Sequence, residues 1–208
     1  MSSSTHIYLL RHGETQGGSR YNGSTDVALS ECGWSQMRAA VESATCWDRI
    51  ISSPLSRCAQ FAQSLQRQNN ISLQFDERIR EIHFGIWEGK TAAEVFESDG
   101  DALTRYWQDP VQHTPIEGEA LKDFETRVLS FWQEVIARYH GEKILLIAHG
   151  GVIRLLLCHI LQRPLQRIFD IEVAHASLHH IRVEHTLQNT TYTAFIETTI
   201  DAIIEQKK

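Results

Sequence analysis

Histidine and arginine side chains follow three apolar segments of the sequence, close to the point where each segment ends. Arg11 and His12 close the first segment, Arg57 lies soon after the second, and His149 closes the third. A neutral imidazole can attack phosphorus, and a guanidinium presents a fixed, permanently charged fork to phosphate oxygens. These residue types therefore indicate phosphoryl transfer through a phosphorylated histidine.

The three apolar segments predict the strands that position these side chains. Their apolar runs are continuous, which is typical of strands covered on both faces in a largely parallel sheet. The segments are residues 7–10, 47–51 and 143–148. Since ligands of open α/β sheets bind at the carboxyl ends of the strands, the histidines and arginines are expected at one edge. The sequence predicts an α/β fold, a three-layer sandwich with a mostly parallel central sheet and helices on both faces.

Apolar periodicity, caps and proline positions predict the remaining elements. Helices are expected at residues 30–43, 55–68, 119–139 and 152–161, and two late strands at 177–183 and 191–196. The polar stretch from 80 to about 118 has helical fragments near 92–97 and 101–107 and reads as a lid or insertion. We expect residues 1–208 to form a single domain.

Composition limits the function further. The chain has a net charge of -6, which argues against a nucleic-acid or anionic membrane surface, because both require a sustained positive field. No apolar run approaches the roughly 20 residues needed to cross a bilayer, and residues 1–6 lack the features of a signal peptide. The four cysteines form no C-x-x-C pair, so reduced thiols are expected. The cytoplasm is the default compartment.

Short motifs stand at the three strand ends: LRHGET at 10–15, SPLSRC at 53–58 and AHGGVIR at 148–154. Two further segments, REIHFGIWEG at 80–89 and EGE at 117–119, lie between them. Each motif alone is moderate evidence, but the ordered set spans nearly the whole chain. The sequence resembles the histidine phosphatase superfamily, which has the phosphoglycerate-mutase-like fold.

The resemblance implies a role for five residues. His12 corresponds to the nucleophile, Arg11 and Arg57 to the phosphate-clamping arginines, His149 to the second pocket histidine, and Glu81 to the acid. Glu81 would protonate the leaving alcohol and then deprotonate the attacking water. Fixed arginine and histidine donors stabilise the charge on the transferred group, so no metal ion and no other cofactor is expected.

Three further residues are expected to bind phosphate or substrate. The turn that contains Asn22 and Gly23 resembles a family segment that places an amide near the phosphate. Gly150 opens the helix after the third strand, where N-terminal amides attract negative charge. The family commonly has an asparagine where this chain has residues 17–19, Gly-Gly-Ser. His175 stands where relatives often have asparagine, and we expect no role for it.

The remaining histidines and two tryptophans are better explained as structural. Trp87 and Trp107 could line a substrate pocket, although we favour a place in the small core of the 80–118 segment. The other histidines belong to no second constellation; they are His6, His83, His113, His140, His159, His179, His180 and His185.

The main hypothesis is a phosphomonoesterase that acts on a small phosphate ester, as a monomer or homodimer. A cofactor-dependent phosphoglycerate mutase is the nearest rival. Residues 91–118 contain Arg105 beside six acidic residues, and an acidic lid would repel a second phosphate, which favours hydrolysis. Another reading is metal-dependent hydrolysis with His12, His149 and Glu81 as ligands, although Arg11 and Arg57 would repel a divalent cation at that place. A further reading is a non-catalytic phosphate-binding or interaction module. The short length and the EGEA segment at 117–120 resemble the α-ribazole phosphatase branch of cobalamin assembly.

Overall fold

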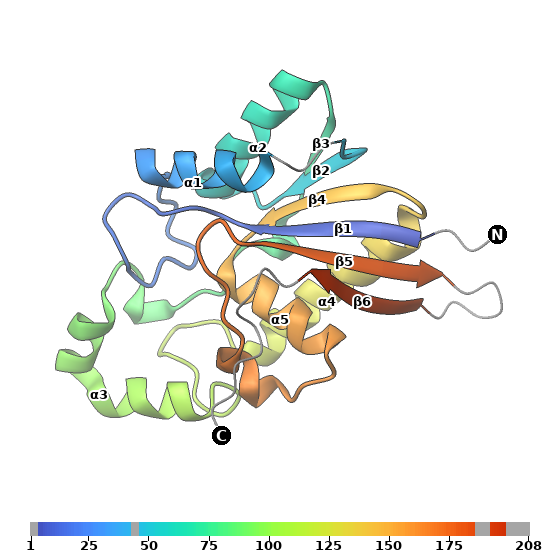
Figure 1. Cartoon of the computed structure of the whole chain (residues 1–208). Coiled ribbons are helices and arrows are strands. Elements are labelled where there is room, and N and C mark those ends of the chain that lie inside the picture. Colours follow the sequence, from blue (N-terminus) through green and yellow to red (C-terminus); the bar gives the residue numbers. More distant parts are fainter. Residues whose placement is uncertain (1–3, 43–45, 186–191, 199–208) are drawn as a thin grey trace.

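The fold is built on one twisted sheet with helices on both faces, as a computed structural model of the chain shows (Figure 1). The structure describes residues 4–42, 46–185 and 192–198. In this part of the chain the sheet has six strands in the order β3-β2-β4-β1-β5-β6. The strands are β1 (Ser4–Arg11), β2 (Arg49–Ser52), β3 (Ser72–Phe75), β4 (Lys143–Ala148), β5 (Leu178–His185) and β6 (Tyr192–Thr198).

The first four strands are parallel, and β5 is antiparallel to both of its neighbours. The register pairs Arg11 at the end of β1 with Ala148 at the end of β4, and Ser52 at the end of β2 with Ile147. The segments that follow these three strands therefore start from the same edge of the sheet, as predicted.

The described residues form five α-helices, of which four cover the sheet (Figure 1). Helices α1 and α2 cover one face, over β2 and β4, and α4 and α5 cover the other (Figure 1). They are α1 (Glu31–Glu42), α2 (Ser56–Asn69), α3 (Ala92–Gln108), α4 (Leu121–Arg138) and α5 (Gly150–Ile160), and three short 3-10 helices are η1 (Glu77–Ile79), η2 (Gly85–Trp87) and η3 (Leu165–Asp170). The predicted three-layer α/β sandwich is confirmed.

Side chains of β1 point alternately to the two faces of the sheet, and the core around the sheet forms one cluster on each face. Ile7 and Leu9 pack with residues of α4 and α5 on one face, whereas Leu10 packs with residues of α2 on the other. Strand β4 is buried from Ile144 to Ala148, because it lies in the centre of the sheet and is covered on both sides. Burial of its apolar side chains on both faces stabilises the layers.

The structure corrects several predicted boundaries. Strand β3 was not expected, because it is a short edge strand whose first and last residues are exposed. Helix α5 begins at Gly150 rather than at 152, so both glycines after His149 lie in its first turn. Strand β2 begins at Arg49 rather than at Trp47. Residue 43 at the end of the first predicted helix lies outside the described residues.

The helical fragments predicted near 92–97 and 101–107 are the two halves of α3. The backbone leaves the helical conformation at Asp99, where φ is -158° and ψ is 70°. The Asp99 carboxylate accepts a hydrogen bond from the Ala102 N–H at 3.0 Å and so caps the second half. This cap explains why one helix reads as two fragments in the sequence.

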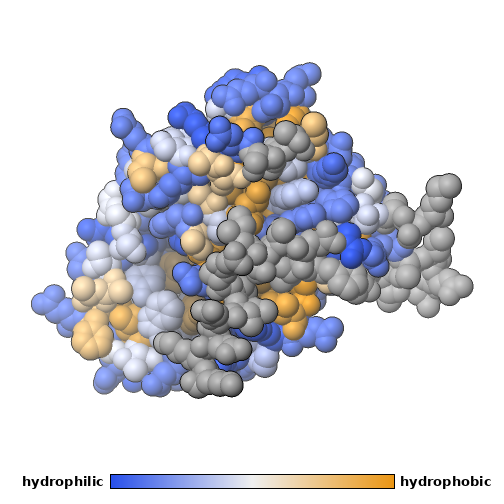
Figure 2. Space-filling model, in the orientation of Figure 1, coloured by the Kyte–Doolittle hydropathy of each residue, from blue (hydrophilic) through white to orange (hydrophobic). Residues whose placement is uncertain are grey.

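The segment around α3 has its own small core. Trp87 is buried there with Val95, Leu103 and Tyr106, so its predicted core role is confirmed. Figure 2 shows hydrophobic residues on the surface over α3, at the lower left of the view. Within the described part of the chain, no helix is both long and apolar enough to span a membrane.

Candidate active site

A pocket of about 300 Å³ opens at the carboxyl ends of β1 and β4. Five of the predicted site residues line it: Arg11, His12, Asn22, Glu81 and Gly150. The other three, Gly23, Arg57 and His149, are buried against the pocket and do not line it. The structure therefore brings all eight residues together: five form the pocket lining and three are buried behind it.

His12 presents one ring nitrogen to the pocket. Its Nδ1 lies 2.8 Å from the Gly13 carbonyl oxygen, which can only accept, so the proton is on Nδ1 and Nε2 has a free lone pair. Burial lowers the pKa of His12 well below 6.5, and the positive charges of Arg57 and Arg11 lower it further. The imidazole is therefore neutral at neutral pH and can act as a nucleophile through Nε2.

Gly13 fixes the backbone behind His12 in a way that the sequence did not predict. Its φ is not in the positive region, so the turn itself does not require glycine. A Cβ on Gly13 would lie 2.3 Å from the Gly33 carbonyl oxygen in α1, and a Cβ on Gly33 would lie 2.0 Å from the Glu14 oxygen. Both glycines are needed because α1 packs directly against the His12 loop.

Arg57 is fully buried and holds the loop that carries Asn22 and Gly23. Its Nη1 donates to the Thr25 carbonyl at 2.8 Å, and its Nη2 donates to the Asn22 and Gly23 carbonyls at 2.9 and 2.7 Å. Its Nε donates to Nδ1 of His149 at 3.1 Å. The guanidinium is thus fixed by neutral acceptors, so its positive charge remains available to an anion.

The contacts of His149 determine its tautomer. Because Arg57 can only donate, Nδ1 of His149 is unprotonated and Nε2 carries the proton, which points to the Ser53 hydroxyl oxygen at 2.7 Å. The two rings of His12 and His149 are 5.3 Å apart. Burial lowers the pKa of His149 well below 6.5, and nearby Arg57 lowers it further.

Arg11 and Gly150 lie side by side on the pocket wall. The Nη1 of Arg11 donates to the Val173 carbonyl at 2.6 Å, whereas its buried Nε has no partner. Burial and the neighbouring charge of Arg154 lower the pKa of Arg11 to about 10, which still leaves it charged at neutral pH. A Cβ on Gly150 would lie 3.3 Å from this Nε, so glycine leaves the donor accessible to a bound anion.

Glu81 reaches the pocket from the loop between η1 and η2. One carboxylate oxygen accepts from the Gly151 N–H at 2.9 Å, and the other accepts from the Ile82 N–H at 3.1 Å. A Cβ on Gly151 would lie 2.3 Å from the Glu81 carboxylate. The second glycine of the AHGG motif therefore provides the space in which the carboxylate sits.

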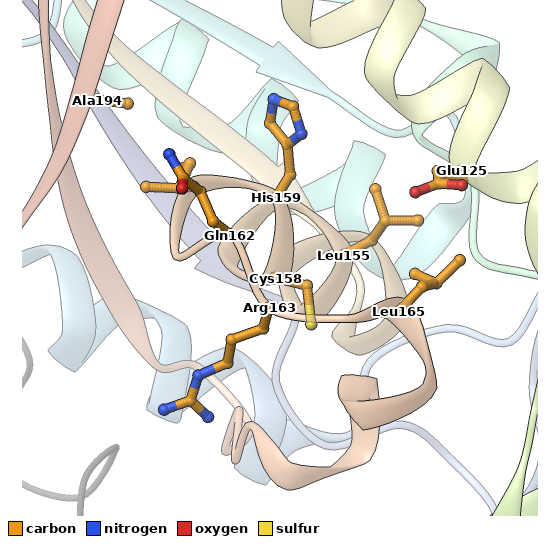
Figure 3. A pocket seen from close by; sticks show the side chains of 9 residues that line it. Glu125, Leu155, Cys158, His159, Gln162, Arg163, Leu165 and Ala194 are labelled. Atoms are coloured by element: carbon orange, nitrogen blue, oxygen red, sulfur yellow. The ribbon is translucent and has the colours of Figure 1, made fainter.

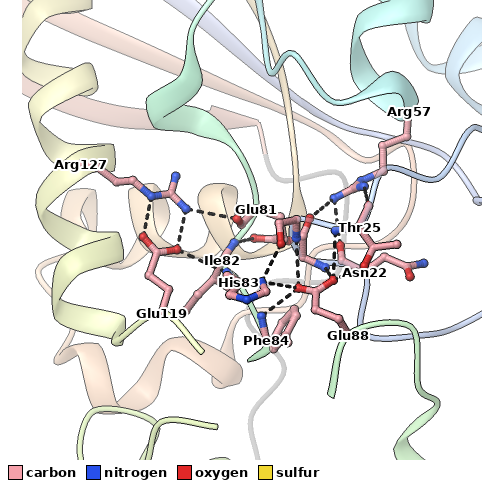
Figure 4. A network of polar contacts seen from close by, with 12 residues as sticks. Asn22, Thr25, Arg57, Glu81, Ile82, His83, Phe84, Glu88, Glu119 and Arg127 are labelled. Carbon is pink, nitrogen blue, oxygen red and sulfur yellow. Dashed lines mark hydrogen bonds and ion pairs between the residues drawn. The ribbon is translucent and has the colours of Figure 1, made fainter. Parts of the chain in front are cut away.

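Arg127 and Glu119 form an ion pair that supports Glu81 from behind (Figure 4). The Nε of Arg127 lies 2.6 Å from Glu119, and its Nη atoms donate to the carbonyls of Arg78, Arg80 and Glu81 at 2.7, 2.8 and 3.1 Å. The pair thereby fixes the backbone on which the Glu81 side chain stands.

Glu88 ties the Asn22 loop to the Glu81 segment (Figure 4). Its carboxylate accepts from the N–H groups of Gly23, Ser24, Thr25 and Phe84 at 3.2, 3.0, 3.0 and 2.9 Å. Burial raises the pKa of Glu88, but the hydrogen bonds from Thr25, Phe84 and Ser24 outweigh burial and hold this pKa below its usual value.

Sequence reasoning missed several residues of this site. Glu88, Glu119 and Arg127 act on backbone atoms, and Ser53 acts on His149, so none of them reads as chemical from residue type alone. Ser53, Glu88 and Glu119 lie inside the motif segments at 53–58, 80–89 and 117–119, and this position could have indicated a role in the site. Arg127 lies outside these segments, so the sequence contained no such indication for it.

Two residues placed outside the site by the sequence analysis line the pocket. Trp107 does so although a core role was favoured. It is 48% exposed and contacts Phe169, with ring centroids 4.3 Å apart and the ring planes tilted by 53°. His175 does so although no role was expected, and its ring lies 5.8 Å from that of His12. Trp107 reaches the pocket because of the orientation of α3, and His175 reaches it because of the path of the loop before β5.

A second cavity of about 570 Å³ lies at the other end of α5 (Figure 3). Leu155, Cys158, His159 and Leu165 line it together with Glu125 of α4. None of the predicted site residues is among its lining residues. The larger cavity is therefore separate from the chemistry gathered at the strand ends.

Comparisons with known proteins agree with this geometry. A sequence model of the histidine phosphatase superfamily, branch 1, matches residues 7–193. A glucosyl-3-phosphoglycerate phosphatase of Mycobacterium tuberculosis is 32% identical over 172 residues, covering 76% of each chain. Phosphoserine phosphatase 1 of Hydrogenobacter thermophilus is 29% identical over 182 residues, covering 86% of each chain.

Solved structures share the fold along nearly the whole chain. The native mycobacterial glucosyl-3-phosphoglycerate phosphatase Rv2419c aligns with a TM-score of 0.83 and 27% identity, covering 93% of this chain and 97% of that one. The α-ribazole phosphatase from Shigella flexneri aligns with a TM-score of 0.78 and 21% identity, covering 97% and 100%, a likeness that shows the fold alone. By the match of the superfamily model and the agreement of fold with named phosphatases, this chain belongs to branch 1 of the histidine phosphatase superfamily.

Proposed function

We propose that the protein hydrolyses a small phosphate monoester in two steps, through a phosphohistidine on Nε2 of His12. The observation that carries the proposal is the state of this ring. Its Nδ1 proton is committed to the Gly13 carbonyl, and its Nε2 lone pair faces a pocket lined by Arg11. Burial and two arginines keep the ring neutral, which is the reactive form.

In the first step, His12 Nε2 bonds to phosphorus as the bond from phosphorus to the ester oxygen breaks. Glu81 acts in this step in its carboxylic acid form and transfers its proton to the departing oxygen, so the alcohol leaves neutral. The Gly13 carbonyl accepts from the Nδ1–H while positive charge develops on the ring, as an orienting acceptor does for other nucleophile-activating histidines. Arg11, Arg57 and the amides at the start of α5 stabilise the equatorial oxygens.

In the second step, a water molecule gives a proton to Glu81 and bonds to phosphorus as the bond to Nε2 breaks. Inorganic phosphate is released, and both His12 and Glu81 return to their starting protonation states. This cycle requires the carboxyl group of Glu81 to reach the ester oxygen, and its position on the Gly151 N–H in the pocket wall supports that role.

The structure removes one argument for hydrolysis over mutase action. None of the six acidic residues of the 91–118 segment lines the pocket, where this segment contributes Ala92 and Trp107. Repulsion of a second phosphate by an acidic lid therefore has no basis at this site. The preference for hydrolysis depends instead on the relatives, which are named as phosphatases.

A small substrate suits a pocket of about 300 Å³, at the low end of the range for ligand sites. The relatives are named for phosphoserine and glucosyl-3-phosphoglycerate, and α-ribazole 5'-phosphate is a third candidate because of the EGEA segment. Phosphoserine is the smallest of the three and is the candidate that we favour.

The test is a hydrolysis panel run in EDTA. It contains p-nitrophenyl phosphate, phosphoserine, α-ribazole 5'-phosphate, and 3-phosphoglycerate with a bisphosphoglycerate primer. We expect release of inorganic phosphate by the wild type and near abolition in His12→Ala. Substantial turnover by His12→Ala would refute the nucleophile assignment, phosphoglycerate isomerisation would favour the mutase, and loss of activity in EDTA restored by metal would favour metal-dependent hydrolysis. Tight phosphate binding without hydrolysis would favour a binding module.

A further inference from the structure

The pocket contains a cation that the proposed mechanism does not use. Arg154 lies on α5 and lines the pocket. Its Nε donates to the Ile171 carbonyl at 2.9 Å, which fixes the side chain against the segment before β5. Within the described residues, its two Nη atoms form no hydrogen bond and no carboxylate pairs with it.

The other arginines of the pocket are engaged differently. Arg20 pairs with Glu94 at 3.1 Å and also donates to the Gly89 carbonyl. Arg11 donates to the Val173 carbonyl and faces His12. Arg154 is thus a pocket arginine whose Nη donors are free for an anion, fixed in place by a neutral acceptor.

Arg154 borders the space next to Arg11 and Gly150, because a Cβ on Gly150 would lie 3.2 Å from Nη1 of Arg154 and 3.3 Å from Nε of Arg11. The Glu81 carboxylate accepts from the N–H of Gly151, and positions i and i+3 of a helix lie on the same face, so Gly151 and Arg154 are neighbours. The charge of Arg154 acts on Arg11 and also on Tyr106 in α3, so Arg154 lies between the phosphate-binding end of the pocket and the α3 segment. Arg154 is therefore next to residues proposed to hold the phosphate, so an anionic group that it binds must lie close to the esterified oxygen.

The surroundings of Arg154 suit a short leaving group. The wall opposite the sheet is aromatic, with Trp107 and Phe169 in contact and Phe84 beside them in the lining. A carboxylate that enters this space loses water and needs a fixed charged partner. The free Nη atoms of Arg154 provide one, and a guanidinium binds a carboxylate through two parallel hydrogen bonds.

We propose that the leaving group of the substrate carries a carboxylate close to the esterified oxygen, and that Arg154 binds this carboxylate. The substrate class is therefore the phosphorylated hydroxy acids, and Arg154 is a specificity-determining residue. This inference rests on the proposed phosphomonoesterase function and goes beyond it, because it selects among the phosphate esters that the His12 site can process.

The experiment uses two pairs of esters that differ by the carboxylate. One pair is 3-phosphoglycerate and glycerol 3-phosphate, and the other is phosphoserine and phosphoethanolamine. In each pair, we expect the kcat/KM of the wild type to be about tenfold or more higher for the ester that contains the carboxylate. Arg154→Gln should lower kcat/KM for the two carboxylates by about 10- to 100-fold and for their partners by less than about threefold. Arg154→Lys should restore part of the preference.

The control variant is Arg167→Gln, which removes an exposed arginine of η3 that pairs with Asp170 and does not line the pocket. It should leave every rate unchanged. Equal loss for both members of each pair in Arg154→Gln, or no preference in the wild type, would overturn the proposal. Hydrolysis of p-nitrophenyl phosphate reports separately on the function, because it depends on His12 whatever the role of Arg154.

Discussion

Replacing Glu88 by glutamine should loosen the site, since its carboxylate serves two segments at once. One oxygen accepts from the N–H groups of Ser24 and Phe84, and the other accepts from those of Gly23 and Thr25. A glutamine amide keeps one acceptor oxygen and replaces the other with a donor. Two backbone N–H groups therefore lose their acceptor and face another donor, whichever way the amide is turned.

The expected loss of stability follows from these two groups. Leaving a buried donor without a partner costs about 1–3 kcal/mol, so two such donors should lower the free energy of unfolding by about 3 kcal/mol. For a chain of this length the midpoint of thermal unfolding falls by roughly 2–4 °C per kcal/mol, which gives a decrease of roughly 6–12 °C for Glu88→Gln. Activity should fall as well, because the Asn22 loop loses its anchor.

The pH dependence separates the carboxylate from a general packing effect. The pKa of Glu88 is below its usual value in the folded state, so its stabilisation is present above that value, near 4.5, and is lost as pH falls through the folded pKa. The difference in melting temperature between the wild type and Glu88→Gln should therefore be largest near pH 7 and shrink below pH 4.5.

Differential scanning calorimetry at pH 7 and at decreasing pH measures both quantities. Glu97→Gln, at an exposed position of α3, is the control and should melt within about 1 °C of the wild type, as surface substitutions usually do. If Glu88→Gln melts within about 2 °C of the wild type at pH 7, the argument from unsatisfied donors is wrong.

Two further predictions concern the acid and the histidines. Gly151→Ala should displace the Glu81 carboxylate, since the new Cβ would lie 2.3 Å from that group. Hydrolysis of alkyl esters should then slow more than hydrolysis of aryl esters, which need less help from an acid. Equal slowing of glycerol 3-phosphate and p-nitrophenyl phosphate hydrolysis would count against the prediction. Burial, with Arg57 next, lowers the pKa of His12 and His149, so the unfolded chain binds protons below pH 6.5 that the folded chain does not. The two neutral rings therefore stabilise the fold above pH 6.5, and this contribution is lost as pH falls below 6.5. Urea unfolding should give a lower free energy of unfolding at pH 5.5 than at pH 7. Equal free energies at the two pH values would contradict the prediction.

The sequence predicted the parts of the site whose chemistry is carried by residue type. Arg11 ends β1 and His12 follows it, so their place at the sheet edge and the chemistry proposed for them both follow from one motif. His149 was predicted in the same way, but its burial behind the pocket was not. That burial depends on Ser53 and Arg57, which come from another strand end and meet His149 only in the folded chain.

Residues that act through the backbone were beyond sequence reasoning. Arg127 lies on the predicted long helix and looks like one of its surface charges, yet its Nη atoms donate to three carbonyls of the Glu81 segment. Charge counting failed in the 91–118 segment for a related reason. A sum over a segment does not say which side chains face the pocket, and α3 turns Trp107 rather than its acids inward.

The positive pocket of a protein with net charge -6 is explained by where the carboxylates bind. Glu81 lines the pocket, but Glu88 binds backbone N–H groups and Glu119 binds Arg127, both away from the pocket lining. Arg57 and Arg11 donate instead to neutral carbonyls and to His149, so their charges are held in place but not cancelled. A phosphate group that enters the pocket meets a field that needs no rearrangement, and such preorganisation lowers the barrier to transfer. The cost of this arrangement is the burial of Arg11 and its repulsion by Arg154, which together lower the pKa of Arg11, and a bound anion relieves the repulsion.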